Sequence, residues 1–279
     1  MELNGITKNK ALSSRTRFSS DRAFRFVLIG ILAAVIIFFL VLVASMAGFT
    51  NWGTFWSSLI SSETLFAIRL SVVTASVSAI IGMLIAVPVA YAVSQFVFPG
   101  KNIVDSLLDL PIILSPVALG AALLIFFNTP VGGFINNNIL RFTFSVPGIV
   151  AAQVIVVTAL AIRLLKSTFD SIDPRYEQVA RTLGCSKPKA FFKITLPMAR
   201  NGLISAVILT WARAVGEFGA AVMLAGATPM KTETLPISIY LAMSSADINR
   251  AIATILILIL IALVAVLTMR GLTHRSYPL

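Results

Sequence analysis

Long apolar stretches that lack charged residues divide this sequence, and they limit its fold more than any other feature. Five of them contain no Asp, Glu, Lys or Arg, and a sixth is interrupted only by Arg213 and Glu217. An α-helix rises about 1.5 Å per residue, so about 20 apolar residues cross the ~30 Å hydrocarbon layer of a membrane. The six stretches are Phe26–Ala47, Leu70–Val93, Leu110–Phe127, Phe142–Ile162, Asn201–Ala227 and Ala251–Met269. We therefore expect an all-α integral membrane protein with about six membrane-spanning helices.

The composition excludes a soluble globular protein. Hydrophobic residues make up 58% of the 279 residues and charged residues only 12%, whereas soluble domains average about 45–50% and about 25%. The net charge is +11; a nucleic-acid-binding protein is also basic, but it carries that charge on a hydrophilic surface. We therefore expect contact with membrane lipid and none with nucleic acid. The single cysteine, Cys185, excludes an intramolecular disulfide.

The basic residues are unevenly distributed between the two sides of the expected membrane. Six spans place both termini on one side, and seventeen basic residues fall there: Lys8, Lys10, Arg15, Arg17, Arg22, Arg25, Lys101, Arg163, Lys166, Arg175, Arg181, Lys187, Lys189, Lys193, Arg200, Arg270 and Arg275. Four fall on the other side: Arg69, Arg141, Lys231 and Arg250. Because Lys and Arg are enriched in cytoplasmic loops, we expect a multi-pass cell-membrane protein with both termini and the loop 163–200 in the cytoplasm.

Helix-perturbing residues occur in three of the expected spans: Pro88 in the second, Pro111 and Pro116 in the third, and Gly216 and Gly219 in the fifth. Membrane helices tolerate proline where neighbouring groups satisfy the backbone. These residues therefore indicate either packing kinks or a hinge. The segments 128–145 and 228–249 connect spans on the external side, and we expect them to be loops.

The cytoplasmic loop between the fourth and fifth spans contains signals for two short helices. Asp173 can cap a first helix and Pro174 suits its first position. Gly184 is placed to end that helix in the left-handed conformation. Ser186 can cap a second short helix, and Pro197 can open the fifth span. The pattern predicts a basic helix–turn–helix platform, which suits either a membrane-surface element or a docking site for a partner.

The same loop resembles the signature of ABC-transporter permease subunits, which reads Glu-Ala-Ala, three residues, Gly, nine residues, Ile-x-Leu-Pro. The matching positions are Gln178, Val179 and Ala180 for the triplet, then Gly184, Ile194, Leu196 and Pro197. Gln178 and Val179 depart from the Glu and Ala of the signature, and Glu177 lies one residue earlier. The location also agrees, since the signature belongs in the cytoplasmic loop before the penultimate span.

The resemblance implies a division of labour between this chain and an ATPase. The segment from about Ile172 to Gly184 would be a coupling helix seated in a groove of a separate ATPase subunit. The sequence has no G-x-x-x-x-G-K-[ST] phosphate loop, so we expect this chain to bind no cofactor and a partner to hydrolyse ATP. The implied permease domain covers 64–270. It follows a basic cytoplasmic tail at 1–25 and a first transmembrane helix at 26–48, and a second cytoplasmic tail occupies 271–279.

A second resemblance concerns the transported substrate. The elements Gly216–Ala220 (GEFGA), Met223–Gly226 (MLAG) and Thr234–Tyr240 (TLPISIY) look like those of the molybdate/tungstate permease branch. Sulfate permeases carry a similar EFGA element. The resemblance implies a homodimer of permeases with two ATPase subunits and an external substrate-binding protein. The alternatives are a permease for sulfate or another tetrahedral oxyanion, and a membrane scaffold or receptor that does not transport.

Arg213 and Glu217 are the only charged residues inside a predicted span. Four residues apart, they share a helix face and can pair, and intramembrane charges usually face a bundle interior or an aqueous cavity. The pair is either a structural ion pair or part of a translocation pathway in which Arg213 attracts an oxyanion. Ala212, Gly216 and Ala220 form a small-residue stripe, which predicts close packing against another helix.

The sequence contains no arrangement of residues typical of an enzyme. Asp105 and Asp109 fall at the start of a cytoplasmic helix, where negative charge suits the helix dipole. We find no catalytic constellation, no metal-ligand spacing and no intramembrane acid–base pair for catalysis. We therefore expect a protein that is not itself an enzyme.

Overall fold

The computed structural model describes residues 3–49 and 51–274, and the regular elements of these residues are all helices. The chain divides into two compact units, Met1–Asn51 and Trp52–Leu279. The first unit consists of one helix, α1 (Leu3–Gly48), which contains an apolar segment, Phe24–Met46, of mean hydropathy 3.4. Nothing within the first unit covers the side chains of this segment, as expected for a span that faces lipid.

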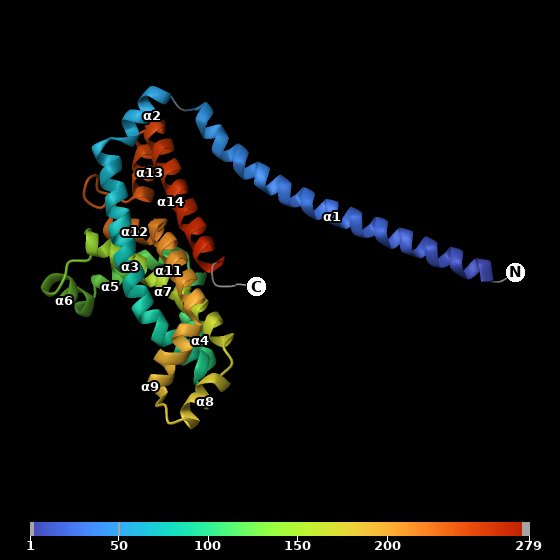
Figure 1. Ribbon diagram of the computed structural model, residues 1–279. Coiled ribbons are helices and arrows are strands. Elements are labelled where there is room, and N and C mark those ends of the chain that lie inside the picture. Colours follow the sequence, from blue (N-terminus) through green and yellow to red (C-terminus); the bar gives the residue numbers. More distant parts are fainter. Residues whose placement is uncertain (1–2, 50, 275–279) are drawn as a thin grey trace. The chain divides into compact units, whose positions relative to one another are not determined.

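The second unit contains the remaining helices of the described residues (Figure 1). They are α2 (Trp52–Leu59), α3 (Ser62–Gln95), α4 (Lys101–Ile113), α5 (Pro116–Phe127), α6 (Pro130–Asn138), α7 (Val146–Asp170), α8 (Arg175–Thr182), α9 (Lys187–Ala190), a π-helical turn (Phe191–Thr195), α10 (Leu196–Met198), α11 (Arg200–Val215), α12 (Gly219–Ala225), α13 (Leu235–Ser244) and α14 (Ile248–His274). Helices α8 and α9 lie at one end of this unit, and α2 and α13 lie at the other.

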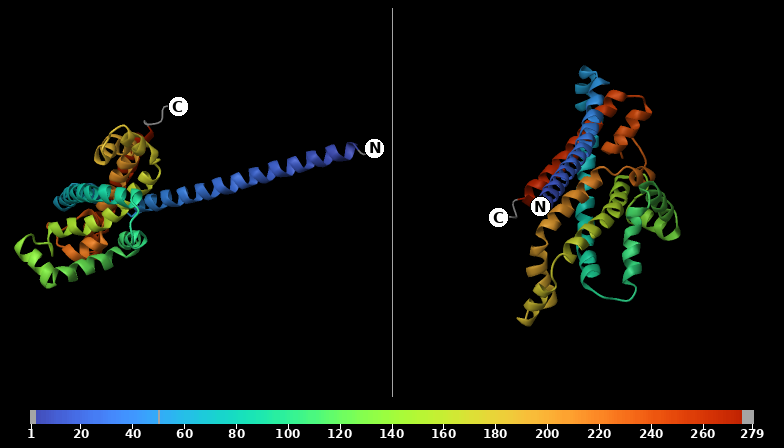
Figure 2. Two further views of the ribbon diagram at one scale, coloured as in Figure 1. Left: turned by 90° about the horizontal axis from the view of Figure 1, so that it is seen from below. Right: turned by 90° about the vertical axis from the view of Figure 1, so that its right-hand side faces the viewer.

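The centre of the second unit is the pair α3 and α7, which run side by side in both orientations shown (Figures 1 and 2). Their contact is made by small and β-branched residues. Ala86 and Ala90 of α3 are fully buried in one cluster with Ala161 and Leu165 of α7. Small side chains let helix backbones approach closely, which is the main source of packing energy between helices in a membrane.

Three helices described in the second unit are long and apolar enough to cross a membrane unbroken, namely Ser62–Gln95, Val146–Asp170 and Ile248–Leu272. Two further spans are bent pairs. Helices α4 and α5 meet at 106°, and the segment Lys187–Met198 meets α11 at 73°. With the apolar segment of α1, the described chain therefore has four continuous spans, or up to six if each bent pair counts as one. The prediction of about six spans agrees with the upper number.

The predicted span Leu110–Phe127 is not one straight helix, because it belongs to a bent pair of helices. The first helix ends at Ile113 and the next begins at Pro116. Ser115 precedes a proline, which disfavours helical backbone, and its hydroxyl accepts a hydrogen bond from Ala118 N at 3.2 Å as an N-cap. By contrast, Pro88 and Pro111 lie inside continuous helices.

The predicted span Asn201–Ala227 is also interrupted. Helix α11 ends at Val215, Gly216 is its C-cap, and α12 begins at Gly219. The small-residue stripe predicted for this span is therefore not on one helix, because Ala212 precedes the break and Ala220 follows it.

The helices that follow the two breaks, α5 and α12, pack against each other. A Cβ atom added to Gly120 of α5 would lie 2.6 Å from the carbonyl oxygen of Ala220 in α12. A Cβ on Gly219 would lie 3.0 Å from Cβ of Pro116. Only glycine at these positions permits this approach of the two helices.

The two segments expected to be external loops each contain a helix, α6 in 128–145 and α13 in 228–249. Thr129 caps α6 by accepting a hydrogen bond from Gly132 N at 3.2 Å. Helix α13 is attached to α3 because Leu235 N donates to Ser71 Oγ at 2.7 Å. Proline in the first turn favours a helix in both segments, and in α6 the cap of Thr129 adds to it.

Candidate functional site

The loop that carries the permease-like signature forms the helix–turn–helix predicted from its sequence. Arg175 N donates to Asp173 Oδ1 at 2.9 Å, which starts α8. Gly184 has φ of +85°, and Cys185 N donates to Ala180 O at 3.0 Å, which closes the helix end. Ser186 precedes α9 but makes no side-chain cap. Pro197 lies in α10, so it does not open the fifth span, and α11 begins only at Arg200.

Helix α8 exposes an apolar surface at the end of the second unit where α8 and α9 lie. Tyr176, Val179 and Leu183 are 55%, 59% and 83% exposed. Their spacing of three and four residues places them on one face. Ala180 is buried and Gln178 is exposed. An exposed apolar face on a short, otherwise polar helix is typical of a surface that another protein covers.

The remaining signature residues lie on the segment that returns from α8 to α11. Ile194 and Leu196 are half-buried and Pro197 is exposed. Ile194 belongs to the π-helical turn, and Leu196 and Pro197 belong to α10. The signature therefore marks the two arms of one hairpin, with Gly184 at its tip.

The acidic residue of this loop, Glu177, points into the protein. Its carboxylate accepts hydrogen bonds from the Tyr91 hydroxyl of α3, at 3.0 Å to Oε1 and 2.9 Å to Oε2. The hydroxyl of Thr195 also donates to Oε1. Glu177 thus joins α8 to α3 and to the π-helical turn.

Arg213 and Glu217 form the ion pair predicted from their spacing, with Arg213 Nη1 2.7 Å from Glu217 Oε2. The two side chains differ in exposure, since Glu217 is 1% exposed and Arg213 is 37% exposed. Glu217 Oε1 also accepts a hydrogen bond from Ala220 N at 3.0 Å, so its carboxylate caps α12. The pair spans the break at Gly216, which is itself exposed.

The sequence reasoning missed a second charged cluster between α4 and α7. Arg163 Nη1 lies 3.2 Å from Asp105 Oδ1, and its guanidinium also pairs with Asp109. Arg163 was predicted to be in the cytoplasmic loop, but α7 continues to Asp170. The spacing of four between Asp105 and Asp109 was the available signal, because it places two carboxylates on one helix face.

A buried glutamine and a second buried ion pair were also missed. Gln153 of α7 is fully buried; it accepts from Ser78 Oγ at 2.9 Å and donates to Ala214 O at 2.9 Å. Glu233 is fully buried and pairs with Arg250. A single polar residue within an apolar stretch was the only signal for Gln153, and Glu233 lies in a segment that was expected to be an external loop, which Arg250 directly follows.

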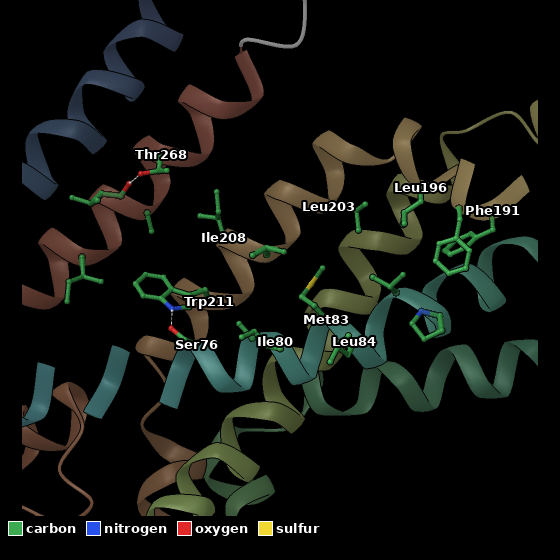
Figure 3. A pocket seen from close by; sticks show the side chains of 18 of the residues that line it. Ser76, Ile80, Met83, Leu84, Phe191, Leu196, Leu203, Ile208, Trp211 and Thr268 are labelled. Atoms are coloured by element: carbon green, nitrogen blue, oxygen red, sulfur yellow. Dashed lines mark hydrogen bonds between the residues drawn. The ribbon is translucent and has the colours of Figure 1, made fainter. Parts of the chain in front are cut away.

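A large groove between α3, α11 and α14 is apolar (Figure 3). Its volume is about 1140 Å³, and Ile80, Met83, Leu203 and Ile208 are among the side chains that line it. Two hydrogen bonds join residues that line it, from Trp211 Nε1 to Ser76 Oγ at 3.0 Å and from Thr268 Oγ1 to Val264 O at 2.7 Å. None of its lining residues is charged. An oxyanion requires hydrogen-bond donors or cations, so this groove does not suit an anion.

Among the described residues, no group of three or more His, Cys, Asp or Glu side chains has an arrangement that could hold a metal ion. Arg163, Arg213 and Arg250 instead pair with carboxylates, and Glu217 also caps α12. The candidate site therefore consists of the exposed apolar face of α8 and the charged pair at the α11–α12 break.

Comparison with known proteins identifies relatives of this chain. Residues 78–276 match the family model "Binding-protein-dependent transport system inner membrane component". The chain is 32% identical to the probable transport system permease protein NifC of Clostridium pasteurianum, over 86% of this chain and 85% of that protein. It is 40% identical to the molybdate/tungstate transport system permease protein WtpB of Thermococcus kodakarensis, over 57% of this chain and 60% of that protein. It is 32% identical to the sulfate transport system permease protein CysW of Synechocystis sp., over 75% and 77%.

The fold is also similar to that of a solved structure. A chain in the crystal structure of the bacterial alginate ABC transporter, in complex with alginate pentasaccharide-bound periplasmic protein, superposes with a TM-score of 0.71. The two chains are 19% identical, and the match covers 90% of this chain and 94% of that one. The fold of this chain is therefore a known one.

Proposed function

Because this chain belongs to the family of binding-protein-dependent transport system inner membrane components, we propose that it is the membrane-spanning permease subunit of an ATP-driven importer for molybdate or tungstate. The observation that carries the substrate is the similarity to permeases named for molybdate and tungstate, at 40% identity for one of them. The chain is a multi-pass protein of the cell membrane, as its family and its apolar helices require.

The apolar face of α8 supports docking of an ATPase subunit. This face consists of Tyr176, Val179 and Leu183, and it lies at the end of the second unit opposite α2 and α13. A partner that closes on nucleotide can pull on α8 and shift the attached helices as nearly rigid bodies. A second copy of this chain, two ATPase subunits and an external binding protein complete the proposed importer. Its cytoplasmic side carries the loop 163–200 and both termini.

Arg213 supports passage of an anion at the α11–α12 break. Its guanidinium is partly exposed, whereas its partner Glu217 is buried. The carboxylate balances the charge of Arg213, so an oxyanion would be attracted without being held tightly. Conduction requires binding that is weak enough for release.

A second candidate substrate is sulfate, and the similarity to CysW favours it. Sulfate, molybdate and tungstate are all tetrahedral dianions, so one pathway could carry any of them. The distinction then lies mainly with the binding protein that delivers the anion. A scaffold that does not transport is the remaining alternative.

Uptake into sealed vesicles tests the proposal. The vesicles contain this chain, its ATPase and its binding protein, and each oxyanion is supplied separately with and without ATP. We expect ATP-dependent accumulation of molybdate or tungstate. Accumulation of sulfate alone would show that sulfate, and not molybdate or tungstate, is the substrate. Absence of both transport and a co-purifying ATPase would favour the scaffold.

Replacement of Gly184 by aspartate is expected to uncouple transport from ATP hydrolysis. The φ of +85° at this position costs an L-residue about 1 kcal/mol or more, and the new charge lies at the tip of the docking hairpin. We expect oxyanion uptake to fall about tenfold while the chain still inserts into the membrane. Gly184→Asn is the matched control, since asparagine has the same shape, tolerates the left-handed conformation and adds no charge. Normal uptake by Gly184→Asp would remove the coupling role from this hairpin.

A further inference from the structure

One tyrosine of the long helix α3 contacts the docking hairpin through its hydroxyl. Tyr91 is 9% exposed, and its hydroxyl lies 3.0 and 2.9 Å from the two carboxylate oxygens of Glu177 in α8. A hydrogen bond to a carboxylate is roughly twice as strong as one between neutral groups. Partial burial strengthens it further, because less water competes for the carboxylate.

The ring of Tyr91 is held by three aromatic neighbours, one at the end of α3 itself and two from other segments. Its centroid lies 5.8 Å from that of Phe96, 5.8 Å from that of Phe169 in α7 and 4.5 Å from that of Phe191 in the π-helical turn. Packed in this way, the ring has little freedom to rotate. Any displacement of the hydroxyl must therefore be passed to the backbone of α3.

The second partner of Glu177 lies in the unusual turn that follows α9. Thr195 is 2% exposed, and its hydroxyl donates to Glu177 Oε1. It belongs to the π-helical turn Phe191–Thr195. Such turns are rare and are frequent at functional positions of helices. Glu177 is thus bound by two separate segments, by α3 through Tyr91 and by the π-helical turn through Thr195.

From this geometry we infer that Tyr91 is a positioning residue that transmits movement of α8 to α3 through the carboxylate of Glu177. The inference rests on the proposed function, in which an ATPase moves α8. The hairpin also contacts the end of α3 through Lys187, whose Nζ lies 4.1 Å from the centroid of the Phe96 ring. That cation–π contact depends less on direction than the hydroxyl–carboxylate hydrogen bond does. Because α3 packs along α7 over most of its length, a displacement at Tyr91 would reach the centre of the second unit.

The variant Tyr91→Phe tests the inference, because it removes the hydroxyl and keeps the ring between its aromatic neighbours. The complete complex of this chain, its ATPase and its binding protein is reconstituted in vesicles. The measured quantity is the number of oxyanions imported per ATP hydrolysed. We expect this ratio to fall about tenfold while the complex still assembles and its ATPase still hydrolyses ATP.

Two further variants separate transmission from a merely structural role. Thr268→Val removes the hydroxyl of an exposed threonine of α14, which donates to Val264 O of the same helix, and should leave the ratio unchanged. The double variant Tyr91→Phe with Glu177→Gln should be no worse than Tyr91→Phe alone, because the amide oxygen of glutamine can still accept from Thr195 and the two changes then interrupt the same contact. An unchanged ratio for Tyr91→Phe, or a loss of import that only follows lost assembly, would overturn the inference.

An error in the role of Tyr91 can be distinguished from an error in the proposed substrate. If the unaltered complex imports neither molybdate nor tungstate, the proposed substrate is wrong. The role of Tyr91 is then read from ATP hydrolysis, as the ratio of the rate with loaded binding protein to the rate without it. Tyr91→Phe should lower this ratio, and an equal ratio in both proteins would reject the role of Tyr91.

Discussion

Replacing Gly120 by alanine should lower the free energy of unfolding by roughly 1–3 kcal/mol, the usual cost of overpacking. The added Cβ would lie 2.6 Å from Ala220 O and 2.7 Å from Ala220 Cα. These are backbone atoms, which cannot rotate out of the way as a side chain can, so α5 and α12 must separate. Unfolding of the purified protein in detergent, induced by increasing SDS, measures the change.

Gly133→Ala is the matched control for this prediction, since it makes the same chemical change in the next helix. A Cβ on Gly133 of α6 would have only an ordinary contact, 3.7 Å from Phe127 O. Alanine is a better helix former than glycine by about 1 kcal/mol. This variant should therefore be neutral or more stable. Equal destabilisation by the two substitutions would show that the contact at Gly120 is not tight.

The largest expected effect comes from neutralising Arg213 while leaving Glu217 in place. Arg213→Met keeps the apolar stem but leaves a carboxylate that is 1% exposed without its cation. Leaving a buried charge unpaired costs about 3–5 kcal/mol. The reverse change, Glu217→Gln, should be much milder, because the amide oxygen can still accept from Ala220 N and the partly exposed Arg213 reaches polar surroundings.

The double variant Arg213→Met with Glu217→Gln separates stability from transport. With both charges gone, its unfolding free energy should return close to that of Glu217→Gln alone, since neutral replacements of buried ion pairs are often tolerated. Its oxyanion uptake should be about tenfold slower than that of the unaltered protein, which corresponds to ~1.4 kcal/mol of activation barrier, because no cation remains at the break. Uptake at the unaltered rate in this folded double variant would assign the pair to structure alone.

Hydropathy predicted the long apolar helices better than it predicted the breaks between the shorter ones. The uncharged stretches located the long helices α3, α7 and α14, because burying about 20 apolar residues in lipid outweighs local preferences. The same signal could not detect the breaks at Ser115 and Gly216, since a helix and an interrupted helix of equal composition have equal hydropathy. Local chemistry contained the information: Ser115 before Pro116 is a capping signal.

The candidate site was predictable where its contacts are close in sequence. The left-handed Gly184 and the pairing of Arg213 with Glu217 both follow from spacing along the chain. The contact of Tyr91 with Glu177 joins residues 86 positions apart. Nothing in a single sequence indicates which of the distant residues will face each other, and a tyrosine in an apolar stretch looks like an ordinary packing residue.

The two helix breaks also bear on where this protein can change shape. At residues 114–115 and 216–218 regular helices end and begin again, so bending there would break fewer helical hydrogen bonds than bending within a helix. Bending α3 or α7 would instead strain a continuous ladder. Gly120 and Gly219 allow α5 and α12, the helices that follow the two breaks, to lie in contact. These two helices would therefore move together as one rigid unit, and the two breaks would be its hinges.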